Sequence, residues 1–156
     1  KILLVSATIL AFPIVSKAEP LPADAQPASR EVIEQTYSGF TEIWAGDCRG
    51  GIFFFAGGET HAWCAKSPSS FAVGSWWIED GGMHCRHLLW YYRADERVAA
   101  EPEEPFCLAH SVSPGGQLWR QWPDDREWWL LRADKEFRRG DLFLTKVQQA
   151  RKRLGF

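Results

Sequence analysis

Four histidines are the side chains of this sequence best suited to metal binding or proton transfer: His61, His84, His87 and His110. Only His84 and His87 lie close together along the chain. The segment around them has the pattern of a β-strand, and residues three apart on a strand point to opposite faces of the sheet. Their imidazoles therefore cannot share an ion, and we expect no bound metal.

Acidic residues offer a second route to chemistry, because two carboxylates that face each other across a groove can hydrolyse a glycoside. The candidates lie in segments expected to be solvated loops, and nothing in the sequence makes them face one another: Glu101, Glu103, Glu104, Asp124 and Asp125. The sequence lacks the Gly-x-Ser-x-Gly motif of a serine nucleophile. It also lacks the glycine motifs of phosphate and dinucleotide sites, so we expect no cofactor.

Nine tryptophans point more strongly to a ligand surface. Trp76-Trp77 and Trp128-Trp129 are adjacent pairs, and strand neighbours point to opposite faces, so we expect at least one of these rings to stay exposed. An exposed indole suits a sugar ring or another flat apolar ligand. Alternatively, helices or loops cover the outer face and the rings are core. The candidate ligand-binding residues are Trp63, Trp76, Trp77, Trp90, Trp128 and Trp129.

Residues 1–18 predict export. Lys1 precedes an apolar run at residues 2–15, and Ser16-Lys17-Ala18 resembles a signal-peptidase site. An uncleaved anchor is the alternative, but the run is shorter than the ~20 residues that span a bilayer. We therefore expect a signal peptide at 1–18, a flexible leader at 19–28 and one β-rich domain at 29–156. The expected location is periplasmic or secreted, with no membrane span after cleavage.

The charge balance argues against a nucleic-acid partner. Removing Lys1 and Lys17 leaves sixteen basic and twenty acidic residues, a net charge of −4. Binding to phosphates requires a basic face. The expected partner is therefore an envelope component, either a glycan or a protein.

Four cysteines, Cys48, Cys64, Cys85 and Cys107, are an even number in a chain expected to be exported, which predicts two disulfides. Sequence alone allows three connectivities. A Cys48–Cys64 bridge requires the chain to fold back at Gly50-Gly51, which glycine permits, and Cys85 and Cys107 then pair across neighbouring strands. No Cys-x-x-Cys spacing supports a redox or zinc site.

Hydrophobic patterning predicts a mainly β fold. A short helix begins after Ser29, and a basic helix follows a turn at residues 138–141 and closes the chain. Glycine pairs separate short runs rich in aromatic and β-branched residues, and Asp95 to Pro105 is expected to be an exposed loop. About eight strands are expected, forming an antiparallel sandwich or small barrel: 42–46, 50–56, 59–65, 70–79, 83–92, 105–111, 116–122 and 126–132.

One hairpin can be given a register. If Gly57-Gly58 is a two-residue turn, Phe54 faces His61 and Ile52 faces Trp63. Both faces of this hairpin are then rich in rings. Either both are covered, or one of them binds a ligand.

The order of ring, glycine and cysteine positions resembles a proteobacterial envelope family, catalogued as domain of unknown function 995. The resemblance covers about residues 35–155 and rests on Trp44, Gly51-Ile52-Phe53-Phe54, His61-Ala62-Trp63, Gly74-Ser75-Trp76-Trp77, Asp80-Gly81-Gly82 with Cys85, Phe106-Cys107 with His110, and Trp128-Trp129. It implies export and a compact β domain, and it includes the Cys85–Cys107 pair. It implies no catalytic residues.

These observations favour a non-enzymatic module of the cell envelope that binds a ligand through aromatic rings or plays a structural role. The alternative is a hydrolase of envelope glycans, which requires polar groups that converge in a cleft. A third possibility is an assembly factor that binds another protein by a sheet edge.

Overall fold

The computed structural model describes residues 20–124 and 126–156. The expected signal peptide and the acidic residue Asp125 lie outside this range. Within it, no helix has the length and apolar character needed to cross a bilayer.

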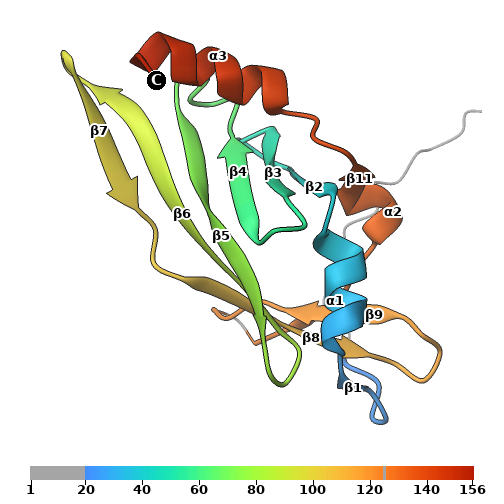
Figure 1. The fold of residues 1–156 in the computed structure, drawn as a ribbon. Coiled ribbons are helices and arrows are strands. Elements are labelled where there is room, and N and C mark those ends of the chain that lie inside the picture. The colour runs from blue at the N-terminus through green and yellow to red at the C-terminus, as the bar shows by residue number, and fades with distance from the viewer. Residues whose placement is uncertain (1–19, 125) are drawn as a thin grey trace, which may run out of the picture.

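One antiparallel sheet of eleven strands dominates the described part of the chain (Figure 1). The strands are β1 (Gln26–Pro27), β2 (Phe40–Trp44), β3 (Gly50–Phe54), β4 (Glu59–Trp63), β5 (Phe71–Glu79), β6 (Met83–Ala94), β7 (Arg97–Pro102), β8 (Phe106–Val112), β9 (Leu118–Gln121), β10 (Trp128–Leu130) and β11 (Phe137–Arg139). The main path runs β10-β9-β8-β6-β5-β4-β3-β2-β11, with β1 beside β8 and β7 beside β6.

The sheet curls into a half-barrel, and the short helix α2 (Ala133–Glu136) connects its two edge strands, β10 and β11. The prediction of a mainly β, antiparallel fold with one helix before the sheet and one after it is confirmed. Of the two architectures expected, the structure has the barrel-like one. All eight expected strands are present with shifted ends, and β1, β7 and β11 were not predicted. β1 lies within the segment expected to be a flexible leader.

The β3–β4 hairpin corrects the predicted register by one residue. The backbone N–H of Phe55 donates to the carbonyl of Glu59, so the loop has three residues instead of two. Its last residue, Gly58, has a φ of +87°, which a side chain rarely adopts. Phe54 therefore faces Thr60 instead of His61. A one-residue slip exchanges the two faces of a strand.

The acidic segment after β6 is a strand, not the expected loop. β7 pairs antiparallel with the second half of β6, with Trp90 opposite Glu101 and Tyr92 opposite Ala99. β8 takes over the pairing with the first half of β6. The proline at residue 102 ends β7, as expected of a residue that cannot donate to a sheet.

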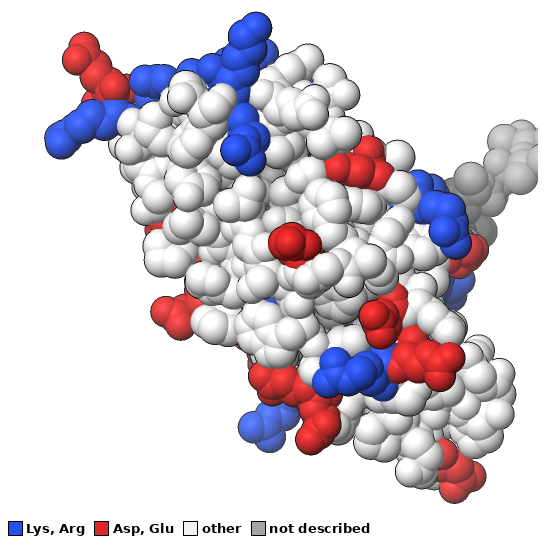
Figure 2. Space-filling model, in the orientation of Figure 1, with Lys and Arg blue, Asp and Glu red and all other residues white. Residues whose placement is uncertain are grey.

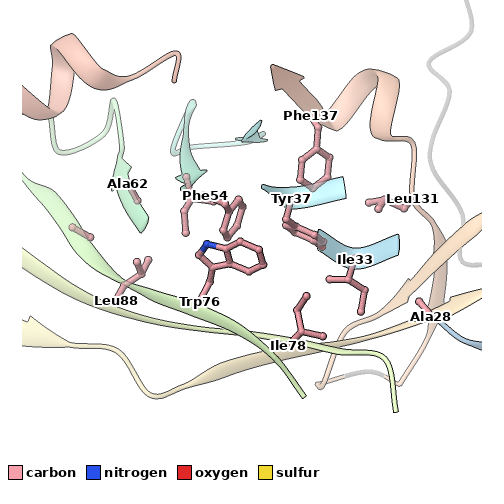
Figure 3. Packing of buried hydrophobic residues seen from close by; sticks show 12 residues of the cluster. Ala28, Ile33, Tyr37, Phe54, Ala62, Trp76, Ile78, Leu88, Leu131 and Phe137 are labelled. Atoms are coloured by element: carbon pink, nitrogen blue, oxygen red, sulfur yellow. The ribbon is translucent and has the colours of Figure 1, made fainter. Parts of the chain in front are cut away.

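Helix α1 (Arg30–Tyr37) lies on the concave side of the sheet. The hydroxyl of Ser29 accepts a hydrogen bond from the backbone N–H of Val32 at 3.3 Å, which caps the helix start as predicted. Ile33 and Tyr37 are fully buried and form the centre of the larger core cluster. Figure 3 shows the rings of this cluster from α1, β3, β5 and β11: Tyr37, Phe54, Trp76 and Phe137.

Helix α3 (Leu144–Leu154) covers the convex side of β4 and β5. Val147, Ala150 and Leu154 form its buried stripe and pack with Trp63 and Phe71. The sheet therefore separates two cores, one on each face.

Both expected disulfides are present. Cys48 pairs with Cys64, and Cys85 pairs with Cys107 directly across β6 and β8. The first fixes the segment after β4 to the β2–β3 loop. The second joins β6 to β8 close to the point along β6 where β8 replaces β7 as its partner.

Candidate functional site

Two aromatic side chains, Trp90 and Tyr92, form a platform at one end of the half-barrel. They lie two residues apart on β6, so their rings share one face of the strand. The platform lines a pocket of about 730 Å³. The rest of the lining comes from β6 itself, from β7 and the segment after it, and from the turn after β4: Arg93, Glu101, Pro102, Glu103, Glu104, Ser67, Pro68, Ser69 and Ser70.

The two rings are held by acidic side chains of the same pocket. The indole N–H of Trp90 donates to Glu103 Oε1 at 2.5 Å, and the hydroxyl of Tyr92 donates to Glu101 Oε2 at 3.3 Å. The backbone N–H of Glu103 donates to the carbonyl of Leu88 at 2.8 Å, which fixes the chain after β7 against β6. The ring and carboxylate positions are thus set by the fold before any ligand arrives.

The opposite wall is a serine-rich turn. Ser70 donates from both its hydroxyl and its backbone N–H to the carbonyl of Ser67, at 2.7 and 2.9 Å. The indole N–H of Trp63 donates to the carbonyl of Pro68 at 3.3 Å. Together with the adjacent Cys48–Cys64 disulfide, these bonds tie the turn to the sheet.

Three glutamates and one arginine, Arg93, give the pocket an acidic character. Carboxylates and serine hydroxyls accept hydrogen bonds from ligand hydroxyl groups, and an aromatic ring packs against the apolar face of a sugar. The pocket can therefore hold a polyhydroxylated ligand without a metal or cofactor. A carboxylate-bearing ligand would meet like charge.

Behind the platform lies a buried ion-pair network. The ring of Trp90 lies 6.5 Å from that of Trp44, and Trp44 lies 5.6 Å from the guanidinium of Arg86. Arg86 reaches Glu42 on β2 at 3.9 Å, and Arg120 on β9 binds the same carboxylate at 2.8 Å.

Arg120 also pairs with Glu136 at the end of α2. Arg120 thereby joins β9, near one edge of the sheet, to β2 and α2, near the other edge. These ion pairs hold the two edges of the curled sheet together. The attraction of Glu42 and the other anions outweighs burial and raises the pKa of Arg120 above its ordinary value.

Three uncharged side chains that contact one another lie beside this network. The hydroxyl of Tyr37 is 2.8 Å from His110 Nε2, and its ring stacks on His84 with centroids 3.8 Å apart. Burial lowers the pKa of His84 well below its ordinary value and that of His110 to about 4. Burial, followed by the charge of Glu42, raises the pKa of Tyr37. All three side chains are therefore uncharged near neutral pH.

Three buried polar atoms of this interior have no hydrogen-bond partner among residues 20–124 and 126–156: Glu42 Oε2, His84 Nε2 and Arg86 Nε. Polar groups of this kind bind ordered water in most proteins. The described residues contain no group of three or more His, Cys, Asp or Glu side chains arranged to hold a metal ion. His84 is buried on the concave face and His87 lies on the other face of β6, as the strand pattern predicts.

The family model described as protein of unknown function (DUF995) matches residues 2–150. The chain belongs to this family. The membership confirms the resemblance predicted from the ring, glycine and cysteine positions. Neither the curated proteins nor the solved structures include a match to the chain.

The structure brings one of the six predicted ligand-binding rings, Trp90, into the pocket of this DUF995 member. Trp63 is buried under α3, where it stacks with Phe143, and Trp76 is buried in the concave core. Trp77, Trp128 and Trp129 are partly exposed but line other surfaces.

Sequence reasoning named Glu101, Glu103 and Glu104 but placed them in a solvated loop, and it missed Tyr92 altogether. The alternation of Trp90 and Tyr92 on one strand was the available signal. No local sequence pattern predicts the ion-pair network, because Glu42 and Arg120 are 78 residues apart in the chain.

Proposed function

We propose that this protein is a non-enzymatic glycan-binding module of the cell envelope, and that the pocket at Trp90 is its binding site. Export is part of the proposal. The apolar segment at residues 2–15 and the two disulfides support it, because disulfides persist in oxidising compartments.

The observation that carries the proposal is the arrangement of rings and carboxylates. Trp90 and Tyr92 present two rings on one face of β6, and each ring donates a hydrogen bond to a carboxylate of the same pocket. This combination of an apolar platform with fixed hydrogen-bond acceptors suits the two faces of a sugar, one of C–H groups and one of hydroxyls.

The test is a Trp-fluorescence titration with an N-acetylglucosamine oligosaccharide, together with cosedimentation on purified peptidoglycan. The Trp90→Ala variant should lose binding. Trp77→Ala is the matched control, since Trp77 is a partly exposed indole that donates to Glu79 and lies outside the pocket. Equal loss in both variants, or saturable binding that survives Trp90→Ala, would overturn the proposal.

A glycan hydrolase is the second candidate, because Glu101, Glu103 and Glu104 all line the same pocket. Mass spectrometry of the oligosaccharide after prolonged incubation separates the two functions. A module that only binds returns the ligand intact. Cleavage that Glu103→Gln abolishes would assign the hydrolase instead.

A further inference from the structure

The outward face of α3 is strongly basic. The helix and the two residues after it carry four cations and no acidic residue: Lys146, Arg151, Lys152 and Arg153. All four are exposed. Figure 2 shows the basic side chains gathered over α3 at the top of the molecule, whereas acidic side chains predominate below.

No carboxylate neutralises this surface within residues 20–124 and 126–156. The ion pairs of the described residues involve other side chains. Lys146 instead lies over the ring of Trp63 at 5.8 Å, and Arg151 lies over Phe71 at 5.5 Å. Arg93 adds a fifth cation, since its guanidinium donates to the carbonyl of Arg153 at 3.1 Å.

The helix dipole explains part of this pattern, because cations stabilise the last turn of a helix. It does not explain the apolar residues around the cations. Of the five large hydrophobic side chains exposed in the described chain, three flank or begin α3: Leu142, Leu144 and Phe156, with 52%, 44% and 56% of their surface accessible. Phe156 packs edge-on against Phe71 and Tyr91, with ring centroids 5.5 and 4.9 Å apart, and still leaves more than half of its surface in solvent. Leu142 and Leu144 likewise leave about half of their apolar surface in water, which is unfavourable.

We propose that the outward face of α3, with Leu142, Leu144 and Phe156, is a docking surface for a bilayer that contains anionic phospholipids. A soluble polyanion would use the cations alone. A bilayer offers phosphates to the cations and an apolar layer beneath the headgroups to the exposed leucines and phenylalanine. Val147, Ala150 and Leu154 keep the helix attached to the sheet, so docking is peripheral.

Docking would also bring the pocket to the bilayer surface. Arg93 lines the pocket and binds the last turn of α3, so the two surfaces are adjacent. The docking proposal stands on separate side chains and does not depend on glycan binding.

The test is cosedimentation with vesicles of phosphatidylglycerol and phosphatidylcholine, and with vesicles of phosphatidylcholine alone. We compare Lys152→Gln/Arg153→Gln with Arg132→Gln/Lys135→Gln. Both remove two exposed cations, both leave the ring contacts of α3 intact, and both keep the same N-terminal segment. At ~1 kcal/mol per cation, the α3 variant should bind anionic vesicles about 30-fold more weakly, whereas the control should bind as the wild type does.

Leu144→Ser tests the apolar part, and it should lower binding to anionic vesicles at high salt, where charge is screened. Equal loss of binding in the two charge variants would overturn the proposal. Equally strong binding of the wild type to the vesicles that lack phosphatidylglycerol would also overturn it. Binding to dextran sulfate with no binding to anionic vesicles would assign a soluble polyanion and also overturn it. Circular dichroism of each variant confirms that the fold is retained.

Discussion

The indole nitrogen of Trp90 lies 2.5 Å from Glu103 Oε1, and this hydrogen bond fixes the ring that forms the floor of the pocket. The ring also packs against Trp44, which contacts Arg86 of the buried ion-pair network. The pocket is therefore supported from behind by the ion pairs that hold the two edges of the curled sheet together. Substitutions in the pocket should weaken ligand binding, whereas substitutions in the ion-pair network should lower the stability of the fold.

Removing the Glu103 carboxylate should weaken ligand binding without unfolding the protein. Glu103→Ala releases the Trp90 ring, and we expect the binding free energy to weaken by ~1.5–3 kcal/mol, the contribution of a charge-assisted hydrogen bond. Glu103→Gln keeps an acceptor for the indole and should retain most of the affinity. Isothermal titration with the N-acetylglucosamine oligosaccharide measures both. A larger loss in the Gln variant than in the Ala variant would contradict the positioning role.

Breaking the interior network should destabilise the fold. Glu42→Gln leaves Arg86 and Arg120 buried with less counter-charge, at a cost of ~3 kcal/mol or more in the free energy of unfolding. Urea denaturation followed by circular dichroism measures the loss. Asp47→Asn is the control, because its ion pair with Lys66 is exposed and contributes ~1 kcal/mol or less. Similar losses of unfolding free energy in the two variants would show that the network does not hold the two edges of the sheet together.

The free energy of unfolding should decrease as the pH is lowered from about 6.5 to about 4. Burial lowers the pKa of His110 to about 4, so the unfolded chain gains a proton at a higher pH than the folded protein does. The contribution is complete above pH 6.5 and is lost as the pH falls toward 4, by up to ~3 kcal/mol. Urea midpoints measured across this range should show a weaker dependence in His110→Gln than in the wild type. An equal dependence in His110→Gln and in the wild type would contradict this account.

The disulfides should leave no free thiol. Thiol titration of the denatured, unreduced protein should find none, since Cys48 pairs with Cys64 and Cys85 with Cys107. Replacing Cys85 and Cys107 by alanine should cost ~2–4 kcal/mol of unfolding free energy, by the loop-closure argument. Two or more reactive thiols per chain would contradict the pairing.

The elements set by local chemistry could be predicted from sequence. Ser29 caps α1, and short runs rich in aromatic and β-branched residues form strands. The even number of cysteines predicted two disulfides, and both are present. The register of the β3–β4 hairpin could not be predicted, because a two-residue and a three-residue loop at Gly57-Gly58 satisfy the same glycine pattern.

The candidate site was predicted only in part, for a different reason. Trp90 was identified by its type and Glu103 by its charge, but their contact depends on β7 pairing with β6. The prolines and acidic residues of this segment suggested a loop. The interior network joins strands that are distant in sequence, and only the curl of the sheet brings Glu42 to Arg120.

The central claim is that a glycan binds at Trp90. The most direct measurement is a proton–nitrogen correlation spectrum of the nine indole N–H groups during titration with the N-acetylglucosamine oligosaccharide, with the Trp90 signal assigned by Trp90→Phe. The proposal predicts a saturable shift of the Trp90 signal, because its indole N–H is the donor to Glu103 in the pocket, and no shift of buried Trp76. A saturable shift confined to Trp77 or Trp128, with the Trp90 signal unmoved, would contradict it.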